Sequence, residues 1–124
     1  MDYRTQQHIT IANRFFLIAT ELGGSPPLQH PCPDWAAIIA FYSAVHYVNA
    51  FMWQMVQVEP SSHHKRKDFV DTNPVLSNVA AEYERLLTLS HDRRYKRLPR
   101  ISQQAVIGAL SDMNAIASFI SPLL

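Results

Sequence analysis

The chain has 124 residues, enough for one domain with its own core, so the sequence predicts a single domain over residues 1–124. Hydrophobic residues make up 48% and charged residues 17%, which excludes an intrinsically disordered chain. The lone cysteine, Cys32, excludes an internal disulfide and a thiolate metal cluster, and the net charge of +1 conceals a basic window at residues 60–100 with nine of the eleven Lys and Arg and five of the ten acids.

The first half of the chain predicts two long helices. Apolar residues spaced by three and four indicate an amphipathic helix over residues 4–22. The segment 23–33 contains four prolines and two glycines, and we expect an irregular connector there. Asp34 then suits the N-cap of a long apolar helix that runs to about Gln57.

The second half predicts a short helix and two longer ones. Ser61 and Ser62 can cap a short basic helix that ends near Val70. Asn73 with Pro74 opens a helix to about Ser90, and Ser102 opens the last one, which reaches Ile120. No strand pattern appears, so the sequence predicts an all-α bundle of four main antiparallel helices plus one short helix.

A polar stripe crosses the otherwise apolar second helix. At about 100° per residue, Tyr42, His46 and Asn49 fall on one side together with Trp35 and Trp53. A buried imidazole or amide needs hydrogen-bond partners, because an unmet one costs about 1 to 3 kcal/mol. The stripe is therefore either a satisfied polar set, inside the bundle or at a two-fold interface, or a ligand-binding site made of Tyr42, His46 and Asn49.

Four stretches carry a family resemblance: DWAAIIAFYSAVHYVNAFM at 34–52, SSHHKRKDFV at 61–70, Tyr83, and LSHDRRY at 89–95. Together they resemble the HEPN (higher eukaryotes and prokaryotes nucleotide-binding) domains over roughly residues 34–97. The resemblance implies a helical fold and an association with RNA or nucleotides. It also implies a homodimer, which we expect to form through the first two long helices, and an antitoxin or nucleotidyltransferase as a further partner.

Many HEPN proteins are metal-independent endoribonucleases in which an Arg is followed, after four to six residues, by a His; Arg85 and His91 fit that spacing. Cleavage without a metal needs a proton acceptor, a proton donor and positive charge on the phosphate. Six residues turn about 240° around a helix, so Arg85 and His91 share a face only if the helix ends near Ser90 or a dimer combines two copies. The more specific family form has a polar residue where Leu86 stands and a Tyr where Arg93 stands.

Four other residues are candidates for an anion pocket: His64 and Arg66 in the short basic helix, and Arg94 and Tyr95 beyond His91. Neighbouring His63 and His64 lack the spacing of a zinc pair, and no phosphate-cradling glycine loop occurs, so we expect no metal and no cofactor.

Two functions follow from these patterns. The first is an endoribonuclease of a toxin–antitoxin or defence system that uses Arg85 and His91. The alternative is a non-catalytic module that binds a nucleotide, RNA or a protein partner through the basic window and the polar stripe. The N-terminus lacks the order of a signal peptide and no uninterrupted apolar run reaches spanning length, so we expect a cytoplasmic protein without membrane contact.

Overall fold

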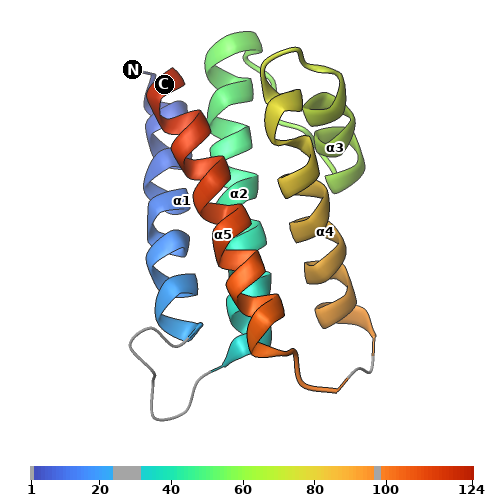
Figure 1. Ribbon diagram of the computed structural model, residues 1–124. Helices are drawn as coiled ribbons and strands as arrows, with labels where there is room; N and C mark the ends of the chain where they lie inside the picture. The colour runs from blue at the N-terminus through green and yellow to red at the C-terminus, as the bar shows by residue number, and fades with distance from the viewer. Residues whose placement is uncertain (1, 24–31, 97–98) are drawn as a thin grey trace.

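A computed structural model describes residues 2–23, 32–96 and 99–124, and these ranges contain helices but no strand (Figure 1). The described elements are α1 (Tyr3–Leu22), α2 (Pro33–Val56), α3 (His63–Thr72), the 3₁₀ turn η1 (Leu76–Val79), α4 (Ala80–Tyr95), α5 (Gln103–Ile120) and the 3₁₀ turn η2 (Ser121–Leu123). The four long helices run alternately in opposite directions, and α3 lies beside α4. The predicted bundle of four main helices plus a short one is confirmed.

Polar caps start three of these helices. The Asp2 carboxylate accepts a hydrogen bond from the Arg4 backbone N–H at 2.7 Å, and so begins α1. The predicted caps Ser62 and Ser102 accept bonds from backbone N–H groups at 3.1 Å and begin α3 and α5. Each cap satisfies an N–H that the first helical turn leaves without a partner.

The start of α2 differs from the prediction. The helix begins at Pro33, whose fixed φ suits a first helical position, and Cys32 occupies the cap position but does not cap the helix with its side chain. Asp34 therefore lies in the first turn, where its carboxylate accepts a bond from the Ile101 backbone N–H and pairs with Arg93, each at 3.3 Å. Of the predicted connector at 23–33, residues 24–31 lie outside the described residues.

The end of α4 also differs from the prediction. Asn73 does cap the turn before it, but the chain passes through η1 and α4 then continues to Tyr95 instead of ending near Ser90. Ser90 is fully buried within α4, and no proline or glycine follows it before the helix ends. Arg85 and His91 therefore lie on one unbroken helix. The short helix α3 is likewise longer than predicted and ends at Thr72.

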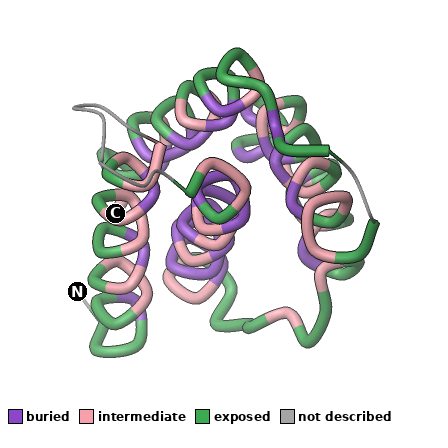
Figure 2. Tube along the Cα trace, turned by 90° about the horizontal axis from the view of Figure 1, so that it is seen from below, coloured by how far each residue is buried: buried purple, intermediate pink, exposed green. Residues whose placement is uncertain are grey.

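The central helix of the bundle is α2, which packs against α1, α4 and α5. Most apolar side chains in its middle, among them Phe41, Val48 and Phe51, are almost fully buried, and Figure 2 shows the buried residues turned toward the interior. Because its own neighbours cover most of α2, a dimer through the first two helices would have to use mainly the outer face of α1. That dimer stays a prediction.

Two helical segments, Pro33–Val56 and Gln103–Leu123, are long and apolar enough to cross a membrane by length and composition alone. The apolar stretch of α2 is mostly buried inside the bundle, as expected for the core helix of a globular domain.

Candidate anion-binding site

The polar stripe of α2 divides into two clusters. One, here called the arginine site, joins side chains from three helices: Tyr42 and Asn49 of α2, His63 and Arg66 of α3, and Arg94 and Tyr95 of α4. The other, the histidine cluster, consists of His8, His46 and Glu59. Both clusters appear only in the folded chain, because their members lie far apart in the sequence.

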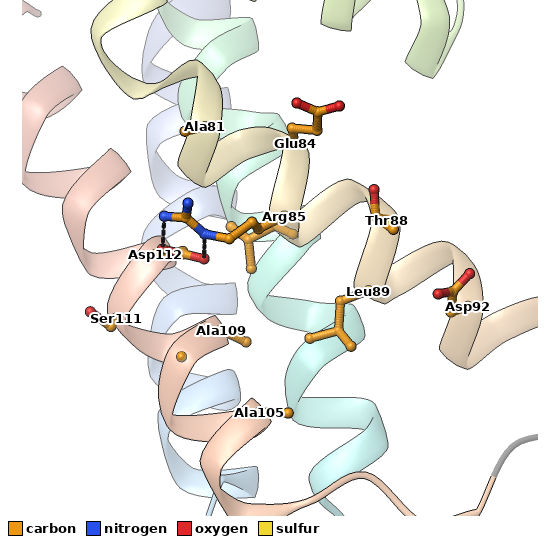
Figure 3. A pocket seen from close by; sticks show the side chains of 12 residues that line it. Ala81, Glu84, Arg85, Thr88, Leu89, Asp92, Ala105, Ala109, Ser111 and Asp112 are labelled. Atoms are coloured by element: carbon orange, nitrogen blue, oxygen red, sulfur yellow. Dashed lines mark hydrogen bonds and ion pairs between the residues drawn. The ribbon is translucent and has the colours of Figure 1, made fainter.

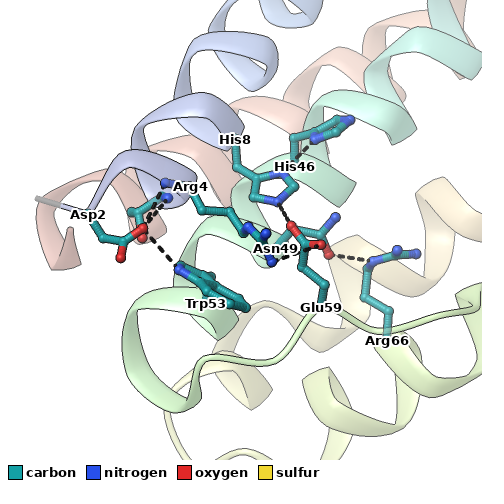
Figure 4. Close-up of polar contacts among 9 residues, drawn as sticks. Asp2, Arg4, His8, His46, Asn49, Trp53, Glu59 and Arg66 are labelled. Carbon is teal, nitrogen blue, oxygen red and sulfur yellow. Dashed lines mark hydrogen bonds and ion pairs between the residues drawn. The ribbon is translucent and has the colours of Figure 1, made fainter.

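Arg66 lies at the inner end of the arginine site, with only 7% of its surface exposed. Its Nε donates to Asn49 Oδ1 at 2.9 Å, as Figure 4 shows, and its Nη1 donates to His63 Nδ1 at 3.0 Å. A guanidinium cannot accept a hydrogen bond, so His63 Nδ1 must be the acceptor and the imidazole proton lies on Nε2. Burial, together with the positive charges of Arg66 and Arg94, lowers the pKa of His63 below its usual value.

Arg94 forms the outer part of the site and is held between two tyrosines. Its Nη1 donates to the Tyr42 hydroxyl at 2.9 Å and to the Tyr95 hydroxyl at 3.3 Å. Its Cζ lies 4.9 Å from the centroid of the Tyr95 ring and 5.5 Å from that of Tyr42, within the range of cation–π attraction. A bond of 3.3 Å from Nε to the backbone carbonyl of Ser90 fixes the rest of the side chain. The guanidinium is thus half-buried and ordered.

The two arginines of the site differ in their partners from the described arginines of α4 that lie outside it. Among the described residues, no carboxylate forms an ion pair with Arg66 or Arg94. Arg66 also acts on Tyr83, which is fully buried: burial raises the pKa of Tyr83 to about 12, and the charge and hydrogen-bonding contact of Arg66 oppose that rise. The protein therefore buries positive charge at this site with neutral hydrogen-bond partners only, an arrangement that an anion would complete.

The histidine cluster, in contrast, satisfies its own members. His46 Nδ1 and His8 Nδ1 are 2.9 Å apart, and His8 Nε2 lies 2.6 Å from Glu59 Oε1, so His8 bridges the other two (Figure 4). Burial lowers the pKa of His46 to about 4, with smaller contributions from His8 and Arg66. The neutral imidazole of His46 links α1 to α2. Its contact with His8 agrees with the alternative in which the polar stripe is a satisfied polar set inside the bundle.

Arg85 lies on a different side of α4, in the groove between α4 and α5 (Figure 3). Its Nε and Nη2 donate to both carboxylate oxygens of Asp112 at 3.0 and 2.9 Å, and Glu82 lies 3.7 Å away. The Asp112 carboxylate raises the pKa of the Arg85 guanidinium. The groove has a volume of about 690 Å³ and small residues such as Ala105, Gly108 and Ala109 along its α5 wall. The charge of Arg85 is thus already neutralised.

His91 lies beside Tyr95 of the arginine site, and its Nδ1 is 3.7 Å from the Asp92 carboxylate. Its side chain is 57% exposed, and its ring centroid lies 5.0 Å from that of Tyr95. No hydrogen bond or ring contact of the described residues joins His91 to Arg85. A single chain therefore does not assemble the predicted catalytic pair.

His64 lies outside the site, with a side chain that is 83% exposed and 3.3 Å from the Asp68 carboxylate. Its neighbour His63 takes the inner position instead, a residue that the sequence analysis did not select. The spacing was informative, because His63 and Arg66 are three residues apart and share a helix face, whereas His64 is rotated by about 100°. The described residues contain no group of three or more His, Cys, Asp or Glu side chains that could hold a metal ion.

Comparisons of this chain with models of known protein families, with curated proteins and with solved structures give no match.

Proposed function

We propose that this protein binds a phosphate-bearing ligand, a nucleotide or an RNA chain, at the arginine site. The observation that carries this proposal is a buried and a half-buried arginine, Arg66 and Arg94, without a carboxylate partner. A guanidinium holds phosphate oxygens in a planar fork, and such charge-assisted bonds are stronger than neutral ones. Burying an unpaired cation costs stability, and a phosphate that binds there would offset the cost.

Ion pairs at other cations of the basic window favour the arginine site as the place where phosphate binds. Four cations of the basic window are already neutralised by neighbours: Lys67 pairs with Asp71, Arg93 with Asp34, Lys96 with Asp92, and Arg85 with Asp112. Among the described residues, a phosphate chain would thus meet positive charge without an ion pair at Arg66, at Arg94 and at the exposed Lys65, rather than at the four paired residues. The resemblance to HEPN domains implies the same class of ligand.

The experiment compares two arginines of one helix. Wild-type protein, Arg94→Gln and Arg85→Gln are titrated with a fluorescently labelled single-stranded RNA and with a labelled nucleoside monophosphate. We expect Arg94→Gln to lose about 10- to 150-fold in affinity, which corresponds to the 1.5 to 3 kcal/mol of a charge-assisted hydrogen bond, and Arg85→Gln to bind as the wild type does.

Two arms of this titration separate the ligand sources. RNA that spans several phosphates gives an affinity that falls steeply with salt, whereas a single nucleotide gives a shallow dependence. Binding of neither ligand by the wild type contradicts the proposal. An equal loss in Arg94→Gln and Arg85→Gln contradicts it as well, because the attraction would then be general.

Cleavage of bound RNA is a second candidate function. It is favoured by the exposed imidazole of His91 beside Tyr95, at the edge of the arginine site, since an imidazole can act as general acid or base. Arg94 is the nearer source of positive charge for His91 within one chain, and a role for Arg85 requires a second copy.

Incubation of single-stranded RNA with the protein in EDTA tests this candidate. Cleavage that leaves 2′,3′-cyclic phosphate ends, and that is lost in His91→Ala, supports it. Restoration on mixing His91→Ala with Arg85→Ala protein would indicate a site shared between chains. RNA that stays intact, or that is still cut by His91→Ala, removes the nuclease from consideration and leaves binding alone.

A further inference from the structure

Tyr95 combines high exposure with fixed geometry. Tyr95 is the last residue of α4 and is 69% exposed, so its ring buries little apolar surface. Yet its hydroxyl accepts a hydrogen bond from Arg94 at 3.3 Å, and the Arg94 Cζ lies 4.9 Å from its ring centroid. The ring of His91, one turn earlier, lies 5.0 Å away at an interplanar angle of 51°. The ring is held in place while much of its surface stays open to solvent.

The position of this ring suits a nucleotide. The Tyr95 hydroxyl accepts from Nη1 of Arg94, and the neighbouring Nη2 of the same guanidinium makes no hydrogen bond to the described residues. A phosphate held at Nη2 would therefore place a base attached to the next sugar close to the ring. Every nucleobase has an aromatic face, and stacking on Tyr is tolerant of sequence. The fixed ring costs the ligand little ordering, because Arg94 and His91 have already restricted it.

We infer that Tyr95, flanked by His91, stacks on an unpaired nucleobase next to the phosphate at Arg94, so that the site selects a base-bearing nucleotide unit over other phosphate esters. This inference rests on the proposed phosphate site and adds the part of the ligand that lies beside the phosphate. It assigns Tyr95 to specificity, and leaves the attraction for the phosphate to Arg66 and Arg94.

A second exposed tyrosine, Tyr3, provides a control for Tyr95. Tyr3 is 78% exposed and lines a surface pocket of α1 together with the uncharged Gln6, Gln7, Thr10 and Ile11. It is therefore a matched control: the same residue type, similarly exposed and also at a helix end, but outside the arginine site.

The test uses two phosphodiester ligands with the same charge, the dinucleotide ApA and its analogue without bases. We expect the wild type to prefer ApA by about 5- to 150-fold, the range that stacking of one base supplies. Tyr95→Ala should abolish the preference while still binding the base-free analogue. Tyr95→Phe keeps the ring and should keep most of the preference, and Tyr3→Ala should behave as the wild type.

Three results would contradict the stacking inference, and they can be told apart. Equal affinity of the wild type for ApA and the base-free analogue overturns the stacking inference and leaves the phosphate site standing. A loss in Tyr95→Phe as large as in Tyr95→Ala also overturns it, because the hydroxyl that orients Arg94 would then be the important group. Failure of both ligands to bind overturns the phosphate site and the stacking inference together.

Discussion

Arg85 and Arg94 belong to the same helix but meet opposite surroundings. They are nine positions apart, about 900° along α4, and therefore lie on opposite faces. On one face Asp112 of α5 neutralises Arg85 through two hydrogen bonds. On the other, Arg94 meets tyrosine hydroxyls and a backbone carbonyl, with Arg66 and His63 of α3 nearby. The contrast shows that positive charge is available to a ligand where the fold has not already paired it.

The two regions therefore have separate roles in this account. The Arg85–Asp112 pair joins α4 to α5 and contributes to the stability of the fold. We propose that the arginine site binds an anion, and that the positive charge it buries lowers the stability of the free protein.

The largest effect is expected at the inner arginine. Arg66→Gln should lower the affinity for a phosphodiester by about 10- to 150-fold, because one charge-assisted bond is worth about 1.5 to 3 kcal/mol. Arg66→Lys should recover part of the affinity, since it restores the charge without the planar fork. Isothermal titration measures both variants, and a circular dichroism melt verifies that each is folded. Wild-type affinity in Arg66→Gln would remove this residue from the site.

The histidine cluster should affect stability and leave binding unchanged. His46→Ala removes the partner of His8 Nδ1, and we expect the free energy of unfolding to fall by about 1 to 3 kcal/mol. Urea denaturation measures the loss, and titration of the same variant with ApA provides the control. A stable variant that no longer binds ApA would mean that the two clusters have been assigned the wrong roles.

The same histidine predicts a pH dependence of stability. The pKa of His46 is about 4 in the folded protein and about 6.5 in the unfolded chain, so the unfolded chain takes up the proton first as the pH falls. The stabilising contribution is complete above about pH 6.5 and is lost as the pH drops toward 4. Urea denaturation of the wild type and of His46→Gln across this window should give a steeper decline for the wild type. Parallel curves would contradict the assignment.

Protonation of His63 should make the affinity for a phosphate ligand depend on pH. Burial and two arginine charges lower its pKa in the free protein, whereas a bound phosphate adds negative charge that favours the imidazolium. Binding then takes up protons, and the affinity for ApA should rise severalfold as the pH falls from 8 toward 6. A phosphodiester keeps its own charge over this range, and His63→Gln should flatten the profile. A slope that persists in His63→Gln would assign the effect to another group.

The smallest effect is expected at Arg85. Arg85→Gln breaks an exposed pair with Asp112, and exposed pairs contribute little to stability. We expect a slight fall in melting temperature and no change in the affinity for ApA. Asp112→Asn leaves Arg85 with only the more distant Glu82 as an ion-pair partner and should raise the affinity for longer RNA slightly at low salt. A large loss of RNA binding in Arg85→Gln would contradict the assignment of phosphate binding to Arg94 and not to Arg85.

The sequence predicted the fold better than the site, for physical reasons. Helices depend on local periodicity and caps, which Ser62 and Ser102 illustrate. The end of α4 was missed because polar residues such as Ser90 fit both a helix end and a buried helical position. The sequence predicts Arg66, Arg94 and Tyr42 as separate candidates. It does not show which carboxylate forms an ion pair with which arginine. The pairing of Arg85 with Asp112 spans 27 positions and depends on how α4 meets α5.

The most direct test observes the arginine side chains themselves. In a titration of the wild type with ApA, followed by NMR of the assigned Nε–Hε groups, the account predicts saturable shifts for Arg66 and Arg94 and none for Arg85. A saturable shift of Arg85, or weak shifts spread over all arginines without saturation, would contradict it.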